Sequence, residues 1–248
     1  MSCRIRPSTT DHIKDEKKYS TVQRTFRHRW WNYYESGLSF AEDKFFLEAV
    51  PDFKEAIQQR IDDQRMARTY GMHFIDYFPH RELGVIYYEM GKLKEAETEL
   101  ELSIENFPSA KARFYLDQVR KKTIEYEGKE VNSPALNLDL KGEHIWTKED
   151  PITISGVAED KCYIAGITIK GSPLFLESSQ KRISFKESLN LSQGQNLIEV
   201  EAKNLLGKVT RQQIIIHVDR EGPTITISDF QFAQDLTKKK YNYYRLDI

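Results

Sequence analysis

The sequence predicts a multidomain α + β protein, in which an N-terminal α-helical solenoid precedes an all-β sandwich. Before about residue 130, Ala, Glu, Lys, Leu and aromatic residues recur at helical spacing. After it, short β-branched runs alternate with Gly, Pro, Asn and Asp. A pattern of about 34 residues also occurs twice in the first part. The 248 residues are enough for two domains, each with its own core.

The clearer copy of the repeated pattern covers residues 77–110. Two helices are predicted here, joined at Gly91. Gly84 has no Cβ and Ala96 has a small side chain, so the two helices can approach closely. The other places of the pattern are filled by His80, Leu83, Tyr87, Leu93, Leu100, Ser103 and finally Pro108, which ends the unit.

A second copy covers residues 30–63, with Gly37 and Gly84 at equivalent places, 47 residues apart. The separation exceeds the period of about 34 residues, so an insertion of about 13 residues is predicted. Ile61 stands where the other unit has proline, so the second helix is expected to run on through Asp62 to about Tyr70. The remaining places are taken by Tyr33, Ser36, Phe40, Phe46, Ala49, Phe53 and Ala56.

The two units resemble the tetratricopeptide repeat family. With a capping helix at 111–126, whose Ala112, Tyr115, Leu116 and Val119 face inward, the resemblance covers about residues 30–126 of a helical domain at 30–128. It implies a groove for a partner peptide, lined by the first helix of each pair. The alternative is that the aromatic residues at 30–34 only cover the end of a short array. The implied groove residues are Trp31, Tyr34, Leu38 and Ala41 from the first unit, and Phe78, Arg81, Val85 and Tyr88 from the second.

Residues 134–228 predict a β-sandwich, which follows a linker at 127–134. Turns are expected at 159–160, 171–173, 192–194 and 204–207. Three strings resemble bacterial immunoglobulin-like modules: Ile-Ser-Gly-Val-Ala-Glu-Asp (154–160), Leu-x-x-Gly-x-Asn-x-Ile-x-Val-x-Ala (191–202) and Val-Asp-Arg-x-Gly-Pro (218–223). The seven expected strands are 135–140, 151–158, 162–169, 182–190, 195–202, 209–218 and 223–228.

The two ends of the chain differ in composition from the predicted domains. Residues 1–29 form a basic leader, expected to be partly disordered, with eight Lys/Arg against three Asp/Glu. Residues 229–248 form an aromatic and basic tail. No signal peptide is apparent, which favours the cytoplasm, but Cys3 so near the start would fit an envelope protein with a truncated N-terminus. The compartment therefore stays open, and no transmembrane segment is predicted.

No catalytic constellation stands out in the sequence. His73, Asp76 and His80 would share a helix face, but His80 falls on a packing position of the repeat, so no metal site is expected. Cys162 is expected to be a buried thiol within a strand. The neighbouring carboxylates Glu42/Asp43 and Asp62/Asp63 are interpreted as exposed, solubilising pairs. The chain is therefore predicted to be no enzyme and to need no cofactor.

Three hypotheses about function remain open. The first is an interaction or scaffold protein, whose groove binds a protein or peptide while the sandwich spaces or anchors it. The second is the regulatory front half of a larger bacterial protease or hydrolase. The third is a carbohydrate-binding envelope module with exposed aromatic platforms. Nucleic acid is not an expected partner, because residues 30–230 hold 25 Lys/Arg against 33 Asp/Glu.

Overall fold

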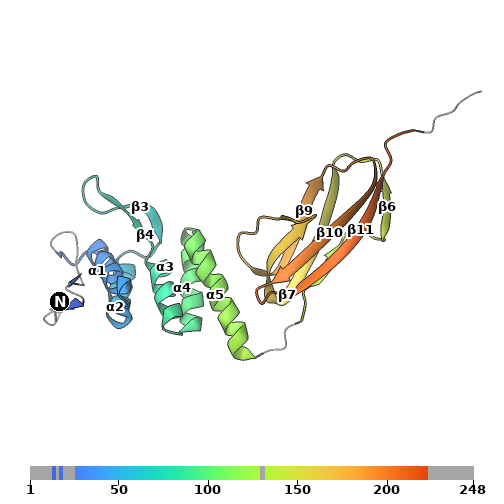
Figure 1. Ribbon diagram of the computed structural model, residues 1–248. Helices are drawn as coiled ribbons and strands as arrows, with labels where there is room; N and C mark the ends of the chain where they lie inside the picture. Colours follow the sequence, from blue (N-terminus) through green and yellow to red (C-terminus); the bar gives the residue numbers. More distant parts are fainter. Residues whose placement is uncertain (1–12, 15–16, 19–25, 129–131, 223–248) are drawn as a thin grey trace, which may run out of the picture. The chain divides into compact units, whose positions relative to one another are not determined.

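The structure is a computed structural model that describes residues 13–14, 17–18, 26–128 and 132–222 (Figure 1). Outside these residues lie most of the basic leader with Cys3, the expected strand at 223–228 and the tail. The described part is a mixed α + β structure, with helices before residue 128 and mainly strands after residue 135. None of its helices combines the length and the apolar character that crossing a membrane requires.

The chain divides into two compact units. The first takes in the helices, the chain up to Asn137, Gly156–Phe185 and Glu199–Gln212. The second takes in Leu138–Ser155, Lys186–Ile198 and the chain from Gln213 onward. Long strands of the C-terminal sheet therefore run through both units.

Helices form two packed pairs and a final single helix. α1 (Trp30–Glu42) packs against α2 (Phe46–Gln59), and α3 (Pro79–Glu89) packs against α4 (Leu93–Asn106). α5 (Ala110–Glu127) then packs against α3 and α4. A helix is thus present where the sequence predicted one at 111–126, and Gly128, in the left-handed conformation at φ 59°, ends it.

An equivalent close contact occurs within each of the two helix pairs. A Cβ added at Gly37 would lie 3.1 Å from the Phe53 ring, and one added at Gly84 would lie 2.7 Å from Leu100 Cγ. Phe53 and Leu100 are both fully buried, as are Ala49 and Ala96 beside them. The close approach predicted from the two glycines is therefore confirmed at equivalent places in both pairs.

The expected extension of the second helix is wrong. α2 ends at Gln59, and the inserted residues form an antiparallel hairpin of β3 (Gln64–Arg68) and β4 (Phe74–Tyr77) that projects between α2 and α3 (Figure 1). Gly71 adopts φ 56° in its turn, a conformation that a helix does not contain. Tertiary packing decides the strand, because Ala67 and Tyr77 are fully buried against the helices.

Asp63 is not the solubilising residue that the sequence suggested. Its side chain is 3% exposed, and its two oxygens accept the amide N–H groups of His80 (3.0 Å) and Arg81 (3.2 Å). These amides belong to the first turn of α3, where Pro79 needs no partner. Asp63 therefore caps α3 from the start of the hairpin. Burial raises the pKa of this carboxyl, and the two amide hydrogen bonds oppose that shift.

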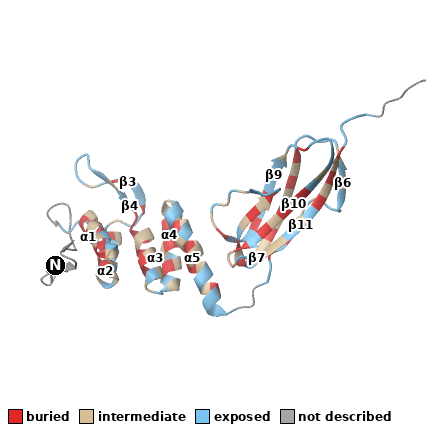
Figure 2. Cartoon of the chain, in the orientation of Figure 1, coloured by how far each residue is buried: buried red, intermediate tan, exposed pale blue. Residues whose placement is uncertain are grey.

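The C-terminal strands form one curled, seven-stranded sheet in the order β5–β7–β10–β11–β6, with β8 and β9 paired to β7. Buried residues alternate with more exposed ones along the long strands, so the sheet buries one face (Figure 2). The strands are β5 (Ala135–Leu138), β6 (His144–Thr147), β7 (Ile152–Ile169), β8 (Ser172–Pro173), β9 (Gln180–Leu189), β10 (Gly194–Asn204) and β11 (Val209–Val218). A short pair, β1 (Ile13–Lys14) and β2 (Lys17–Lys18), precedes the helices.

Two strand predictions need correction. The expected turn at 159–160 is absent, because β7 continues as an 18-residue strand. An irregularity takes the place of the turn: Tyr163 has φ 60°, and the Asp160 side chain accepts the Cys162 amide at 2.6 Å. β6 and β8 were not expected, since both are too short to show an alternating pattern.

Asn204 explains the end of β10 that the immunoglobulin-like pattern marks. It is 1% exposed, and its side-chain oxygen accepts the amides of Leu206 (3.1 Å) and Lys208 (2.9 Å). Its side-chain nitrogen donates to Asp160 at 3.0 Å. The amide group thus holds the turn after β10 and joins it to β7.

We expect Gly84→Ala to destabilise the chain by about 2 kcal/mol, because the new methyl group overlaps Leu100 and this cost exceeds alanine's higher helix propensity. Urea unfolding of the full chain measures the change. Gly166→Ala is the control, since a Cβ there meets nothing within 4 Å. Equal stability of the two variants would contradict the close packing of α3 on α4.

Candidate functional site

The residues predicted to line the groove fall into two groups. Trp31, Ala41, Arg81, Val85 and Tyr88 are half-buried and Leu38 is exposed, so these six reach the surface of α1 and α3. Tyr34 and Phe78 are each 3% exposed, and therefore do not line an open groove.

Tyr34 and Phe78 serve the core instead. The Tyr34 hydroxyl accepts the Phe78 amide at 3.2 Å, and the Tyr34 ring packs edge-on against Tyr77 and Phe53. Phe78 packs against Phe107 at 5.7 Å. Burial raises the pKa of the Tyr34 hydroxyl, so it stays neutral and hydrogen-bonded. These aromatic side chains link the first helix pair to the second.

The surface residues of α3 lie beside a matching set from α5, and we call this set the α3–α5 surface. Tyr88 packs edge-on against Tyr115 at 5.6 Å between ring centroids, and Lys122 Nζ lies 3.8 Å from the Tyr88 ring centroid. Lys111 Nζ lies 2.5 Å from a Glu82 carboxylate oxygen. The α3–α5 surface comprises Arg81, Val85 and Tyr88 of α3 and Lys111, Tyr115 and Lys122 of α5.

Sequence reasoning missed the contribution of α5, which was expected only to close the array. Tyr115 was expected to face inward; it is half-buried, packed against the core and also beside Tyr88. The signal that could have found this surface is the spacing of Lys111, Tyr115 and Lys122, which places all three on one helix face.

Arg81 is held in place on this surface. Its guanidinium lies 4.1 Å from the Phe78 ring centroid and pairs with Glu82 at 2.7 Å. Glu82 thereby contacts both Arg81 and Lys111, so one carboxylate joins the two helices. A charged group positioned in this way loses little entropy when a partner binds.

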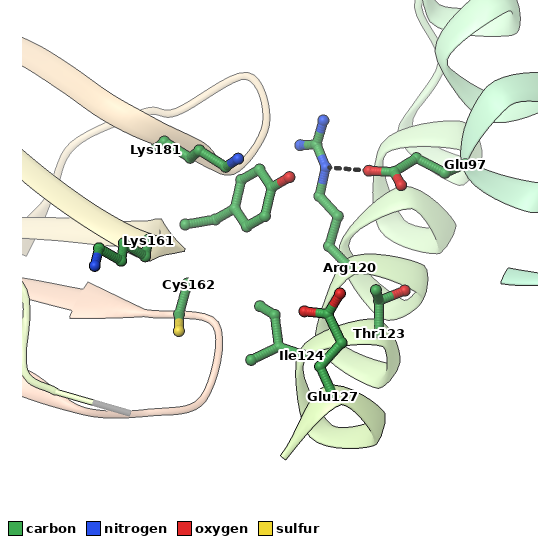
Figure 3. A pocket seen from close by; sticks show the side chains of 9 residues that line it. Glu97, Arg120, Thr123, Ile124, Glu127, Lys161, Cys162 and Lys181 are labelled. Carbon is green, nitrogen blue, oxygen red and sulfur yellow. Dashed lines mark ion pairs between the residues drawn. The ribbon is translucent and has the colours of Figure 1, made fainter. Parts of the chain in front are cut away.

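A cavity of about 640 Å³ lies within the first unit, between α4, α5 and the strands β7 and β9 (Figure 3). Arg120 dominates it: the guanidinium donates to the Ser179 carbonyl at 2.7 Å and to Glu101 at 3.0 Å, and lies 4.5 Å from the Tyr163 ring centroid. These contacts occupy Arg120 structurally. The lining residues are Glu97, Arg120, Thr123, Ile124, Glu127, Lys161, Cys162, Tyr163 and Lys181.

Cys162, in β7, is 6% exposed, which confirms the expected buried thiol. The cavity presents both cationic and anionic groups, with Lys161 and Lys181 opposed by Glu97 and Glu127. Its mixed charges and the structural contacts of Arg120 single out no ligand, and we assign no chemistry to it.

The three residues considered as a metal cluster each contact a different residue. His73 bonds to Thr69, Asp76 accepts the Met66 amide, and His80 Nδ1 lies 2.6 Å from Glu99. Among the described residues, no group of three or more His, Cys, Asp or Glu side chains could hold a metal ion. His80, at 5% exposure, packs as the repeat pattern predicted.

A second exposed feature lies on β6 and β11. Trp146 is 71% exposed, and its ring lies nearly parallel to His217, at 14° and 4.3 Å between centroids. His144 Nδ1 lies 3.1 Å from His217 Nε2. The parallel pairing of the two strands produces this row, because it sets Trp146 opposite His217.

Comparisons with known proteins give only weak structural likenesses. No family model matches the sequence, and no curated protein matches it. Fibronectin(III)-like modules of Clostridium thermocellum CbhA are 17% identical over 40% of this chain and 55% of theirs, with a TM-score of 0.29. The PKD1 domain of Vibrio anguillarum Epp is 17% identical over 36% of this chain and 100% of that domain, with a TM-score of 0.21.

A third similar structure is Bacteroides ovatus SGBP-B of a mixed-linkage glucan utilization locus, in complex with a mixed-linkage heptasaccharide. It is 16% identical over 36% of this chain, with a TM-score of 0.25. This chain spans 55% of the CbhA modules and 24% of the SGBP-B chain. At such TM-scores these likenesses decide neither a fold for the whole chain nor a function.

The His80–Glu99 pair predicts a pH dependence of stability. Burial lowers the pKa of His80, but the Glu99 carboxylate outweighs it and raises the pKa above the ordinary value of 6.5. Stabilisation by the pair is thus complete below pH 6.5 and is lost as the pH rises through the raised pKa. Urea unfolding of the full chain at pH values from 6.5 upward should show the free energy of unfolding falling in the wild type but not in Glu99→Gln. Glu95→Gln, at an exposed position of α4, should behave as the wild type, and an unchanged slope in Glu99→Gln would refute the pairing.

Proposed function

We propose that this protein is a non-catalytic interaction protein, whose helices form a tetratricopeptide-type repeat array that binds a segment of a partner protein. The observation that carries the proposal is the α3–α5 surface, where half-buried aromatic rings and positioned cations from two helices lie side by side. Tyrosine and arginine in such settings carry much of the energy of protein interfaces.

The repeat assignment within this proposal is supported by the equivalence of the two helix pairs. Phe53 on Gly37 and Leu100 on Gly84 occupy the same places, 47 residues apart. A repeat array buries one face of each pair on its neighbour and leaves the other for a partner. α3 packs against α4 and α5 in this way, while Tyr88 and Val85 stay half-buried.

The C-terminal sheet has the role of a spacer or anchor in this proposal, as an immunoglobulin-like module. Its buried residues lie on one face, and its turns are held by buried polar groups such as Asn204. Such a unit is built for rigidity.

The α3–α5 surface can be tested with a double variant, Tyr88→Ala with Lys122→Glu. It removes an aromatic contact and reverses a charge, so we expect partner recovery by the full chain to fall at least about tenfold. Affinity capture followed by quantitative mass spectrometry measures the recovery. The matched control is Tyr126→Ala with Lys121→Glu, two exposed positions elsewhere on α5. If both variants retained the partner, or lost it equally, the partner would bind outside the α3–α5 surface.

A second candidate function, carbohydrate binding, is favoured by Trp146. A flat, exposed indole supported from one side by His217 offers an apolar face to a sugar ring, with imidazole nitrogens nearby for hydroxyl groups. We expect glycan-array binding by the wild type that Trp146→Ala abolishes and Phe175→Ala, at an even more exposed aromatic position, preserves. Silence of the wild type on the array would remove this candidate.

A further inference from the structure

The β3–β4 hairpin gathers exposed apolar side chains that the proposed groove does not use. Five of the thirteen exposed large hydrophobic residues in the described part of the chain lie between residues 61 and 74. They are Ile61 (65% exposed), Met66 (63%), Tyr70 (67%), Met72 (85%) and Phe74 (37%). Monomeric soluble proteins seldom expose such a concentration without a partner for it.

The hairpin is a defined element rather than a loose loop. Its strands pair Ala67 with Ile75 and Arg68 with Phe74. The turn is closed by the His73 amide donating to the Tyr70 carbonyl at 2.9 Å and by the Thr69 amide donating to the His73 carbonyl at 2.9 Å. Arg68 Nε also donates to the Gly71 carbonyl at 2.6 Å. The tip is therefore held in one shape before any partner arrives.

Its two faces differ in character. Ala67, Ile75 and Tyr77 alternate along the face that packs on the helical core. Arg68 and Phe74 occupy the opposite face, because successive residues of a strand point to opposite sides. Tyr70 and Met72 lie at the turn, beyond this pair. The described contacts thus include no partner for the apolar side chains of the outer face and the tip.

Charge is ordered along the hairpin. From Gln64 to Ile75 the chain holds Arg65, Arg68 and His73 and no Asp or Glu. The acidic residues Asp62, Asp63 and Asp76 lie at the base, where Asp63 is buried as the cap of α3. From tip to base, the apolar residues Tyr70 and Met72 are therefore followed by Arg68 and then by Arg65, which lies at about the level of Asp76. Asp62 and Asp63 lie nearest the helices.

This order matches the depth profile of an anionic bilayer surface. Aromatic and apolar side chains enter the boundary with the acyl chains, while arginine remains among the phosphates. Asp62 and Asp63, nearest the helices, stay furthest from the negative surface. A protein partner would need a pocket shaped for the tip, whereas a bilayer needs only this sequence of layers. We propose that the β3–β4 hairpin docks the protein on an anionic lipid membrane, with Tyr70 and Met72 inserted and Arg65 and Arg68 at the headgroups.

Vesicle co-sedimentation of the full chain tests the proposal. We expect binding to phosphatidylcholine vesicles containing about one third phosphatidylglycerol, and much weaker binding to phosphatidylcholine alone. Arg65→Gln with Arg68→Gln should lower the partition coefficient by about 30-fold, since each arginine near the surface contributes about fivefold. Tyr70→Ser with Met72→Ser should lower it by at least about tenfold.

The matched control is Leu47→Ser with Tyr126→Ser, because these side chains are 75% and 91% exposed on α2 and α5, outside the hairpin. It should bind as the wild type does, and all variants should keep the wild-type circular dichroism. Absence of wild-type binding to the anionic vesicles, equal loss in the control, or equal binding to both vesicle types would each overturn the proposal. The proposal would also be overturned if this chain did not sediment with vesicles but its Tyr70 could be crosslinked to another protein.

Discussion

The helical part of this protein depends on one contact made twice, a large apolar side chain of the second helix pressed onto a glycine of the first. Leu100 on Gly84 leaves no room for a methyl group, and Phe53 on Gly37 would have to move by a few tenths of an ångström to admit one. Because the helices approach this closely, Ala49 and Ala96 beside the contact are fully buried. Trp30 and Tyr34 of α1 pack against Tyr77. The same closeness leaves Val85 and Tyr88 on the outer side of α3, next to α5, where the proposed partner would bind.

Much of this arrangement could be predicted from the sequence, because it follows from local spacing. The helix pairs, the capping helix and the one-sided strands follow from apolar residues at periods near 3.6 and 2. The β3–β4 hairpin could not be predicted in this way, since its strand pairing is decided by Ala67 and Tyr77 packing on distant helices. Tyr34 was misplaced for a related reason: the hairpin brings Phe78 and Tyr77 over it, and no spacing within α1 reveals that cover.

Asp63 shows how the inserted hairpin is tied to the helices. Its carboxylate satisfies two amides of α3, seventeen and eighteen positions further along the chain. Sequence reasoning treats a cap as local, two or three residues before its amides. Here the hairpin itself supplies the cap, so α3 and the proposed membrane-docking element stand in a fixed relation. The α3–α5 surface likewise needs α5, whose contribution depends on packing between helices that are not adjacent in the chain.

The parallel pairing of β6 with β11 has a mechanical consequence. The two strands lie near opposite ends of the sheet's sequence and run in the same direction. A pull on the chain before β6 and after β11 would load their hydrogen bonds together, in shear, rather than opening them one by one. The Ile215 amide on the Glu143 carbonyl and the Asp219 amide on the Thr147 carbonyl would carry this load at the same time. A module that spaces a binding surface from an anchor would thereby resist stretching along its length.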